Sequence, residues 1–326
     1  MCKIVSVIIP VYNEERYIEN CIQSLLEQDY PKNKMEFLFL DGRSTDKTVQ
    51  IIDTFLEQYS SLIRIIENPN RTQSYAMNIG IREAKGKYIL RLDAHADYDK
   101  HYISECVRLL ETGLYQNVGG VADTKARSKF GEVVALMMSS RFGVGNSQFR
   151  TSDMEGPVDT VPFGAFSKDY LVSLGGFDER LNRNEDNEIN YRIRKNGGVV
   201  YLSPKIRFTY YCRDTLKGIL SMAFQNGKWT LIASRLCPGS MSLRHLIPLL
   251  FVLSIIALIV LDHFFAVFYL LLMLELALYF SLALLFSIKT KADFKMILQL
   301  LLLFPAFHIS YGCGSIFGII TVIRGV

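Results

Sequence analysis

The chain has 326 residues, of which 50% are hydrophobic, and it carries 36 basic and 32 acidic side chains. Only seven of these charges follow residue 244, whereas the preceding part has the charge density of a soluble domain. This division excludes a wholly soluble or disordered protein, and a net charge of +4 is too small to indicate a nucleic-acid partner.

The beginning of the chain is predicted to be a buried strand rather than a signal peptide. Its apolar run, residues 4–11, is short and rich in branched side chains, and polar and acidic residues follow at once. None of the six cysteines has the spacing of a metal-ligand pair. We therefore expect reduced cysteines and a first domain that stays in the cytoplasm.

Strand and helix patterns alternate in the first part of the chain. Short runs of branched and aromatic residues predict strands at residues 5–11, 35–41, 63–67 and 88–93. Helical patterns lie between them at residues 15–27, 45–58 and 72–84. Such continuous apolar strands are typical of a parallel sheet that is buried on both faces. The sequence thus predicts a doubly wound, Rossmann-like α/β domain.

Polar residues follow three of these strands. They are Pro-Val-Tyr-Asn-Glu at 10–14, Asp-Gly-Arg-Ser-Thr-Asp at 41–46 and Asp-Ala-His-Ala-Asp at 93–97. Because ligands of such sheets bind beyond the carboxyl ends of the strands, we expect these groups to meet at one rim. Helix capping is an alternative role for Thr45 and Asp46, but it does not explain Asp41 or Asp93.

The same segments indicate how a diphosphate could be bound. The chain has neither the G-x-G-x-x-G nor the P-loop pattern, so another positive group must neutralise a phosphate. Residues i and i+2 of an extended segment point the same way, which makes Asp93 and His95 candidate ligands of a divalent cation. A nitrogen ligand favours Mn²⁺ over Mg²⁺, although an isolated Asp-x-His also occurs by chance.

In combination, these motifs resemble glycosyltransferase family 2. The matching segments are residues 6–14, 41–48 and 92–95, then Gly-Gly-Phe-Asp-Glu at 175–179 and Asn-Glu-Asp at 184–186. The resemblance extends over about residues 4–235 and implies the GT-A fold and inverting transfer from a nucleotide sugar. In particular, residues 91–95, 142–145 and 184–186 resemble the membrane-bound succinoglycan-type glucosyltransferases of exopolysaccharide synthesis.

The resemblance also implies roles for individual residues. It places Pro10, Tyr12 and Glu14 beside the nucleoside, Asp41 on its base, Arg71 on the nucleotide, and Asp93 near the ribose and the metal. His95 occupies the position of the family's second metal-binding Asp, a departure that leaves the identity of the metal open.

Asp186 corresponds to the catalytic base of the family. A carboxylate within hydrogen-bond reach can take the proton of an acceptor hydroxyl as it attacks the anomeric carbon, and one direct attack inverts that centre. Glu185 is expected to point away if Asp186 points into the site. The alternative for this acidic pair is a solvated helix start.

The segment after the first domain is predicted to be a helix in the membrane interface. Residues 215–233 repeat apolar side chains at helical spacing, with flanking cations and the single tryptophan, Trp229. Residues 225–229 resemble the Q-x-x-R-W motif of processive family members, with Lys in place of Arg. We therefore assign Glu185, Arg213, Gln225 and Trp229 as candidate acceptor contacts, with interfacial anchoring as the alternative for Trp229.

Three apolar runs, at about residues 246–261, 264–288 and 296–323, predict membrane helices. The predicted domains are thus residues 1–213, 214–244 and 245–326. Basic residues before the first run and between the second and third favour a cytoplasmic catalytic domain and an external C-terminus in a prokaryotic plasma or inner membrane. Gly314 and Gly318 form a small-xxx-small pair that allows close helix contact but also arises by chance.

The sequence therefore predicts a membrane-anchored, metal-dependent glycosyltransferase. It would move one sugar from a nucleotide-diphosphate donor, UDP-glucose or a relative, to a lipid-linked saccharide in surface or exopolysaccharide synthesis. Two other enzymes remain as alternatives: a polyprenyl-phosphate sugar synthase and a processive polysaccharide synthase. A non-catalytic nucleotide-sugar-binding assembly subunit is the alternative from a different class of protein.

Overall fold

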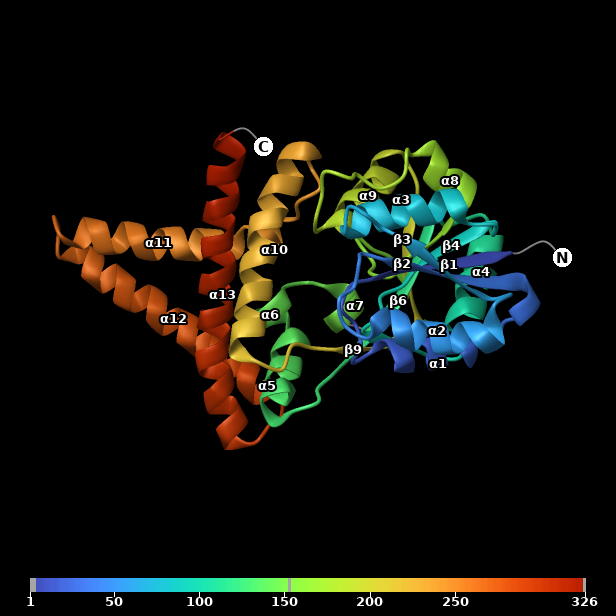
Figure 1. Ribbon diagram of the computed structural model, residues 1–326. Coiled ribbons are helices and arrows are strands. Elements are labelled where there is room, and N and C mark those ends of the chain that lie inside the picture. Colours follow the sequence, from blue (N-terminus) through green and yellow to red (C-terminus); the bar gives the residue numbers. More distant parts are fainter. Residues whose placement is uncertain (1–3, 152–153, 325–326) are drawn as a thin grey trace. The chain divides into compact units, whose positions relative to one another are not determined.

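The computed structural model describes residues 4–151 and 154–324 (Figure 1). The chain forms two compact units. The sheet unit comprises Met1–Asp123 and Ser152–Tyr211, and the helical unit comprises Thr124–Thr151 and Cys212–Val326. Residues 124–151 thus belong with the C-terminal segment, a grouping that the sequence analysis did not make. The domain boundary at residue 213 stays a prediction.

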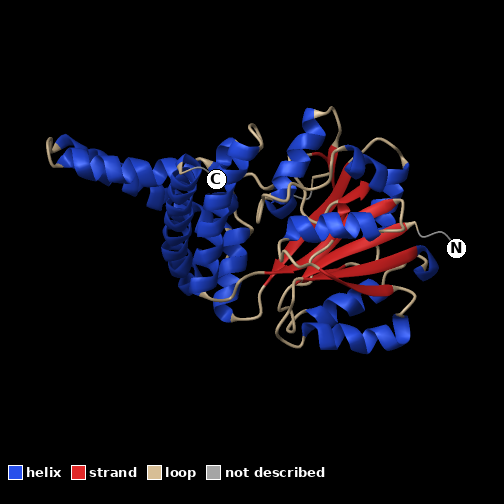
Figure 2. Cartoon of the chain, turned by 45° about the horizontal axis from the view of Figure 1, so that its top comes forward, coloured by secondary structure: helices blue, strands red, loops and turns tan. Residues whose placement is uncertain are grey.

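A nine-stranded sheet forms the core of the sheet unit, and helices cover both of its faces (Figure 2). The strands are β1 (Val5–Val11), β2 (Met35–Asp41), β3 (Ile63–Glu67), β4 (Tyr88–Arg91), β5 (Ala96–Tyr98), β6 (Asn117–Lys125), β7 (Gly156–Pro157), β8 (Ala165–Ser167) and β9 (Val200–Tyr211). The helices are α1 (Ile18–Leu26), η1 (Lys32–Lys34), α2 (Thr48–Tyr59), α3 (Gln73–Glu83), α4 (Tyr102–Glu111), α8 (Lys168–Ser173) and α9 (Glu185–Lys195).

The strand order is β3-β2-β1-β4-β8-β6-β9-β5, with β7 paired to β9. Strands β1 to β4 are parallel to one another, and β8, which pairs with β4, begins an antiparallel part. In β1 and β2 nearly every side chain is buried, as expected for a sheet covered on both faces. The first three predicted strands match the structure residue for residue, and β4 ends two residues earlier than predicted.

The predicted helices α1 and α2 begin three residues later than the sequence indicated. The residues between strand and helix instead form loops that bind each other: the Asn13 side chain accepts from the Thr45 N–H at 2.8 Å, and the Glu14 N–H donates to Thr48 Oγ1 at 2.7 Å. These long-range contacts compete with local helix formation. They also leave polar groups at the carboxyl ends of β1 and β2.

The helical unit consists of α5 (Lys129–Met138), α6 (Arg141–Val144), α7 (Gln148–Thr151), α10 (Leu216–Leu236), η2 (Leu243–His245), α11 (Ile247–Asp262), α12 (Val267–Lys289) and α13 (Phe294–Ile323). Three stretches in the described residues are long and apolar enough to cross a membrane, and each overlaps a predicted run: Leu243–Asp262, Val267–Lys289 and Phe294–Ile323.

Helix α10 packs lengthwise against α13, and the two lie side by side in both views (Figures 1 and 2). The contact is made through glycines. A Cβ at Gly314 would lie 2.0 Å from the Phe224 carbonyl oxygen, one at Gly318 2.6 Å from that of Lys228, and one at Gly227 2.1 Å from that of Tyr311. The Gly314–Gly318 pair is therefore a packing feature, because only glycine allows these backbones to approach so closely.

We expect Gly314→Ala to destabilise the purified protein in detergent. The added methyl group would meet a backbone carbonyl that cannot rotate away, an overpacking that costs about 1–3 kcal/mol. The exposed Ile309, on the same helix, provides a control: Ile309→Ala should leave the thermal midpoint nearly unchanged. Equal midpoints for Gly314→Ala and the unchanged protein would contradict this account of the α10–α13 contact.

The segment 124–151 is fixed to the apolar helices by Phe142. Its ring lies 4.9 Å from the ring of Phe304, 5.3 Å from Tyr279, 5.4 Å from His308 and 5.5 Å from Phe286, centroid to centroid. Arg244 adds a hydrogen bond of 2.9 Å from Nη1 to the Asn146 carbonyl. The Phe-Gly-Val-Gly motif at 142–145 thus joins this segment to α12 and α13.

Candidate active site

Three strand ends of the sheet unit meet at one rim. Gly42 directly follows β2. Its nearest neighbours are the carbonyl oxygen of Val11, the last residue of β1, the Cβ of Tyr12, and the backbone of Arg71, which follows β3. The Arg71 guanidinium lies 5.6 Å from the centre of the Tyr12 ring, and 44% of Tyr12 is exposed. An exposed aromatic ring and a cation therefore stand together where a ligand is expected.

Asp41 organises the loop after β2. Its carboxylate accepts from the Arg43 N–H at 3.1 Å and from the Ser44 N–H at 3.2 Å. Arg43 itself has a positive φ of 62°, which this carboxylate helps to hold. Pro10 lies within β1, opposite Leu40, and contributes to the strand rather than to the loop. The predicted nucleotide-binding residues are thus at the same rim, and their binding roles stay predictions.

The loop after β4 carries the predicted metal ligands. The Asp93 N–H donates to Tyr98 Oη at 2.7 Å, and that hydroxyl donates back to the Asp93 carbonyl at 2.9 Å, which closes the loop. His95 Nε2 lies 4.0 Å from Asp93 Oδ2, and His95 Nδ1 lies 3.5 Å from Glu14 Oε1. Asp93 and Glu14 therefore approach one imidazole from two sides.

A divalent cation fits this pair of side chains. The 4.0 Å between His95 Nε2 and Asp93 Oδ2 is short enough for both side chains to hold one ion, and an imidazole nitrogen with a carboxylate oxygen suits Mn²⁺ or Mg²⁺. No cluster of three or more His, Cys, Asp or Glu side chains suited to a metal is found within the described residues. The protein would then supply few ligands, and substrate phosphates would complete the shell, as is usual for such ions.

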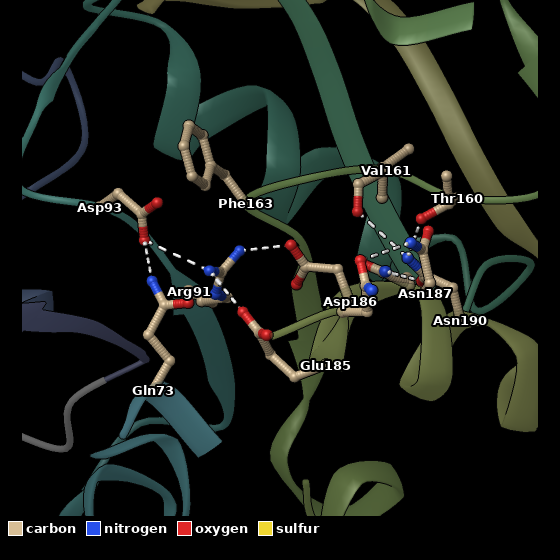
Figure 3. Close-up of polar contacts among 12 residues, drawn as sticks. Gln73, Arg91, Asp93, Thr160, Val161, Phe163, Glu185, Asp186, Asn187 and Asn190 are labelled. Atoms are coloured by element: carbon tan, nitrogen blue, oxygen red, sulfur yellow. Dashed lines mark hydrogen bonds and ion pairs between the residues drawn. The ribbon is translucent and has the colours of Figure 1, made fainter. Parts of the chain in front are cut away.

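Arg91, the last residue of β4, binds three carboxylates (Figure 3). Its Nη1 donates to Asp186 Oδ2 at 2.5 Å, its Nη2 donates to Glu185 Oε1 at 3.0 Å, and the same Nη2 lies 3.4 Å from Asp93 Oδ1. The arginine is 3% exposed. It thus connects Asp93, a predicted metal ligand, to the acidic pair at the start of α9.

Two residues in unfavourable backbone conformations hold this arrangement. Phe163 has a φ of 52°, which is an outlier for a bulky side chain, and its ring covers the Arg91 guanidinium at 5.6 Å. The Tyr102 hydroxyl donates to the Phe163 carbonyl at 2.7 Å. Asn184, with a φ of 65°, precedes α9 and turns the chain so that both acids stand in the first helical turn.

A buried amide network anchors the neighbouring segment. Asn190 on α9 donates to Thr160 Oγ1 at 2.9 Å and to the Val161 carbonyl at 3.1 Å, and it accepts from Asn117 Nδ2 at 2.5 Å. Figure 3 shows these bonds beside the Arg91 cluster. A fully buried network of this kind resists rearrangement, because each broken bond leaves an unsatisfied polar group. It fixes α9 relative to the start of β6 and to residues 160–161.

The environment of Asp186 suits a base. Burial is the largest influence and raises the pKa of this carboxyl to about 7, although the Arg91 charge acts to lower it. Its side chain remains 23% exposed, whereas that of Glu185 is only 5% exposed. Burial likewise raises the pKa of Glu185. Asp186 is therefore the member of the pair that a substrate can reach.

The four predicted acceptor contacts are divided between the two units. Glu185 does not point away from Asp186, because both side chains reach the same guanidinium from adjacent positions of the first helical turn. Its burial disfavours the acceptor contact that we assigned to it. Arg213, Gln225 and Trp229 lie in the helical unit, the last two on α10, and their acceptor roles stay predictions.

Sequence reasoning missed Arg91 as a functional residue. It was noticed only as part of the Arg-Leu-Asp-Ala-His motif, although a cation at a predicted buried strand end requires a charged partner. Gln73 was missed as well. In the amide orientation that satisfies both of its polar ends, it donates to Glu185 Oε1 at 2.7 Å and accepts from Arg91 Nη2 at 3.2 Å.

Comparison with solved structures identifies the fold of the sheet unit. The mannosyltransferase PcManGT from Pyrobaculum calidifontis, solved in complex with GDP-Man and Mn²⁺, superposes with a TM-score of 0.61 at 18% identity. The match covers 97% of this chain and 86% of that one. The curled α/β sheet is the GT-A fold, as predicted, and three apolar helices that could span a membrane follow it.

Sequence comparison shows the family. The profile of glycosyl transferase family 2 matches residues 6–173, more than half of the chain. This protein therefore belongs to glycosyl transferase family 2, which confirms the resemblance seen in its motifs.

Two curated relatives cover most of the chain. One is the dolichyl N-acetyl-alpha-D-glucosaminyl phosphate 3-beta-D-2,3-diacetamido-2,3-dideoxy-beta-D-glucuronosyltransferase of Methanococcus voltae, 32% identical over 68% of this chain and 71% of its own length. The other is the succinoglycan biosynthesis protein ExoA of Rhizobium meliloti, 30% identical over 74% of each chain.

Proposed function

We propose that this protein is an inverting, metal-dependent glycosyltransferase with Asp186 as its base. One observation carries the proposal: Arg91 connects Asp186 to Asp93, so the candidate base stands beside the residues expected to hold the donor. The acceptor hydroxyl would lose its proton to Asp186 as it attacks the anomeric carbon. Because the acceptor attacks the anomeric carbon once, from the side opposite the leaving group, the configuration of that carbon is inverted.

A divalent cation, Mn²⁺ or Mg²⁺, would be held by Asp93 and His95. When bound, it would supply positive charge that stabilises the leaving nucleoside diphosphate. The sequence has no Gly-rich phosphate-binding loop, so this charge must come from another group. Tyr12 and Arg71 would border the nucleoside, with Asp41 on its base. The Mn²⁺ and GDP-Man in the PcManGT structure support a cation and a nucleotide sugar in this fold.

The proposed acceptor is a lipid-linked saccharide of a surface polysaccharide, and the proposed donor is UDP-glucose or a relative. The segment 124–151, which interrupts the sheet unit in sequence, belongs to the unit that contains the apolar helices. The relatives named for a dolichyl phosphate-linked substrate and for succinoglycan biosynthesis agree with such an acceptor. We place the sheet unit on the cytoplasmic side of a prokaryotic plasma membrane, where nucleotide sugars are made.

The experiment uses membranes that contain the full chain, a panel of radiolabelled nucleotide sugars, Mn²⁺ or Mg²⁺, and a lipid extract as acceptor. Label should enter the lipid fraction from one donor, only with metal, and not with Asp186→Asn. A long polymer would identify a processive synthase, and a sugar attached directly to polyprenyl phosphate would identify the corresponding synthase. Donor binding without transfer or donor hydrolysis would favour a non-catalytic subunit.

His95→Ala tests the cation site. We expect the metal concentration for half-maximal transfer to rise about tenfold or more, since even residues outside the first coordination shell contribute this much to affinity. His101, which pairs with Asp29 on the surface, offers a matched control, and His101→Ala should leave the metal requirement unchanged. An unchanged metal curve for His95→Ala would exclude His95 as a ligand.

A further inference from the structure

The helices of the helical unit do not share one direction. Helices α10 and α13 run parallel, whereas α11 extends sideways from α13 and α12 returns obliquely beneath it (Figure 1). Helix α11 meets α13 near its beginning, where Gly312 lies against the Pro248 carbonyl and Val252. The end of α12 returns to α13, where Tyr279 Oη lies 2.8 Å from His308 Nδ1, and the part of the hairpin around its turn at residues 262–266 extends away from α13 (Figure 1). A single membrane normal therefore cannot run along both the hairpin and α13.

The α11–α12 hairpin has the composition and size of a membrane-spanning pair. Its two stretches have mean hydropathies of 2.5 and 2.2, and only 11% and 17% of the residues in their apolar windows are buried. Large apolar side chains are exposed along the whole length of both helices. At 1.5 Å per residue, stretches of 20 and 23 residues measure about 30 and 35 Å, which matches a hydrocarbon core of about 30 Å.

Unlike the hairpin, α13 is hydrogen-bonded along one side to α10, a helix that carries several charged residues. Ser310 Oγ donates to the Leu220 carbonyl at 2.8 Å, and Tyr311 Oη lies 3.1 Å from Thr230 Oγ1. Together with the glycine contacts, these bonds hold α10 beside the second half of α13 in parallel orientation. Helix α10 carries Lys217, Lys228 and Arg235, and a helix with three cations is a poor membrane span.

Because α10 and α13 run parallel and in contact, they would have to cross a bilayer together and in the same direction. If α13 crossed the bilayer, α10 would cross with it, and Arg235 and Arg244 would emerge on the external side. This contradicts the preference of basic residues for the cytoplasmic side. If the hairpin crosses instead, Arg244 and the lysines at 289, 291 and 295 all lie at its cytoplasmic base. Only the turn with Asp262 and His263 is then external.

The exposed side chains of α13 also suit a helix that lies on a bilayer surface. The large apolar ones are Phe294, Leu298, Leu302, Ile309, Phe317, Ile320 and Ile323, and their spacings place them on one side of the helix. The other side faces α10 and its neighbours. At 30 residues, or about 45 Å, α13 is also longer than a bilayer core requires.

We propose that only the α11–α12 hairpin crosses the membrane, while α10 and α13 lie together along its cytoplasmic surface with the apolar side of α13 in the lipid. The bilayer is the partner of this surface. The C-terminus is then on the same side as the N-terminus. This replaces the three-crossing arrangement with an external C-terminus that the sequence analysis favoured, and it does not depend on the catalytic proposal.

The test uses full-length chains that carry either green fluorescent protein or alkaline phosphatase at one of three points: after Val326, after His263, or after Lys291. Green fluorescent protein fluoresces only when cytoplasmic in a bacterial host, and the phosphatase is active only outside, so each position gives a positive signal on either side. Immunoblots normalise each signal to the amount of fusion protein.

We expect fluorescence at Val326 and Lys291 and phosphatase activity at His263. Phosphatase activity after Val326 would overturn the proposal and establish a third crossing by α13. Fluorescence after His263 would overturn it too, because the hairpin would not cross. Protease access to a C-terminal tag provides a second measurement: the tag should be protected in spheroplasts and cleaved in inverted vesicles.

Discussion

Asp186→Asn is expected to lower turnover by about 10²–10⁴-fold, the range that a positioned general base contributes. The amide has nearly the same shape as the carboxylate but cannot accept the proton of the acceptor hydroxyl. Nucleotide binding, measured by calorimetry, should change little, because Asp186 is connected to Asp93 through Arg91 and is not one of the predicted nucleotide-binding residues. Asp53→Asn, on the exposed side of α2, is the matched control and should retain full activity.

The pH dependence follows from the same residue. Burial raises the pKa of Asp186 to about 7, and the base must be ionised to act. The rate should therefore fall about tenfold per unit as the pH drops below 7, and it should level off above it. A rate that stays constant between about pH 5.5 and 8, with saturating metal, would contradict Asp186 as the base.

Arg91→Met is expected to reduce both stability and turnover. Removing one partner of a buried ion pair leaves uncompensated charge and costs about 3–5 kcal/mol, and here three carboxylates would face one another. Loss of the guanidinium charge would also raise the pKa of Asp186 further. The acidic limb of the pH–rate profile should then move to higher pH, a shift that a purely structural role would not produce.

Two further variants sharpen this prediction. Arg91→Lys keeps the charge but cannot donate to two carboxylates with a planar fork, so its thermal midpoint and rate should lie between those of Arg91→Met and the unchanged protein. Arg43→Met removes the exposed pair with Glu67 and should cost no more than about 1 kcal/mol. Arg91→Met with an unchanged midpoint and pH profile would refute a role for Arg91.

Local pattern was sufficient for the first half of the fold. Strands β1, β2 and β3 matched their predicted bounds because a short, continuous run of apolar residues between polar ones indicates a buried strand without knowledge of distant contacts. Asp93 and His95 were placed together because two-residue spacing has a direct geometric meaning in an extended segment. Strands β5, β7 and β8 were not predicted, since with three, two and three residues they are too short for a periodic signal. The longer β6 and β9 were not predicted either, and their apolar patterns are interrupted by Gly119 and Gly120 and by Pro204.

The contacts of the candidate base could not be read from the sequence. Arg91 and Asp186 are 95 residues apart, and no spacing rule connects a strand end to a distant helix start. Glu185 seemed to point away because adjacent helical residues diverge. A long guanidinium with several donors nevertheless reaches both acids in the first turn of α9.

Motif order, periodicity and hydropathy are local properties of the chain, so they were enough to predict the family, the alternation of strand and helix, the polar rim and the apolar C-terminal helices. The folded chain was needed to show that Arg91 joins Asp93 to Asp186, that segment 124–151 belongs with the apolar helices, and that α10 pairs with α13. These features depend on which distant surfaces are complementary in shape and charge, and that complementarity exists only once the chain has folded.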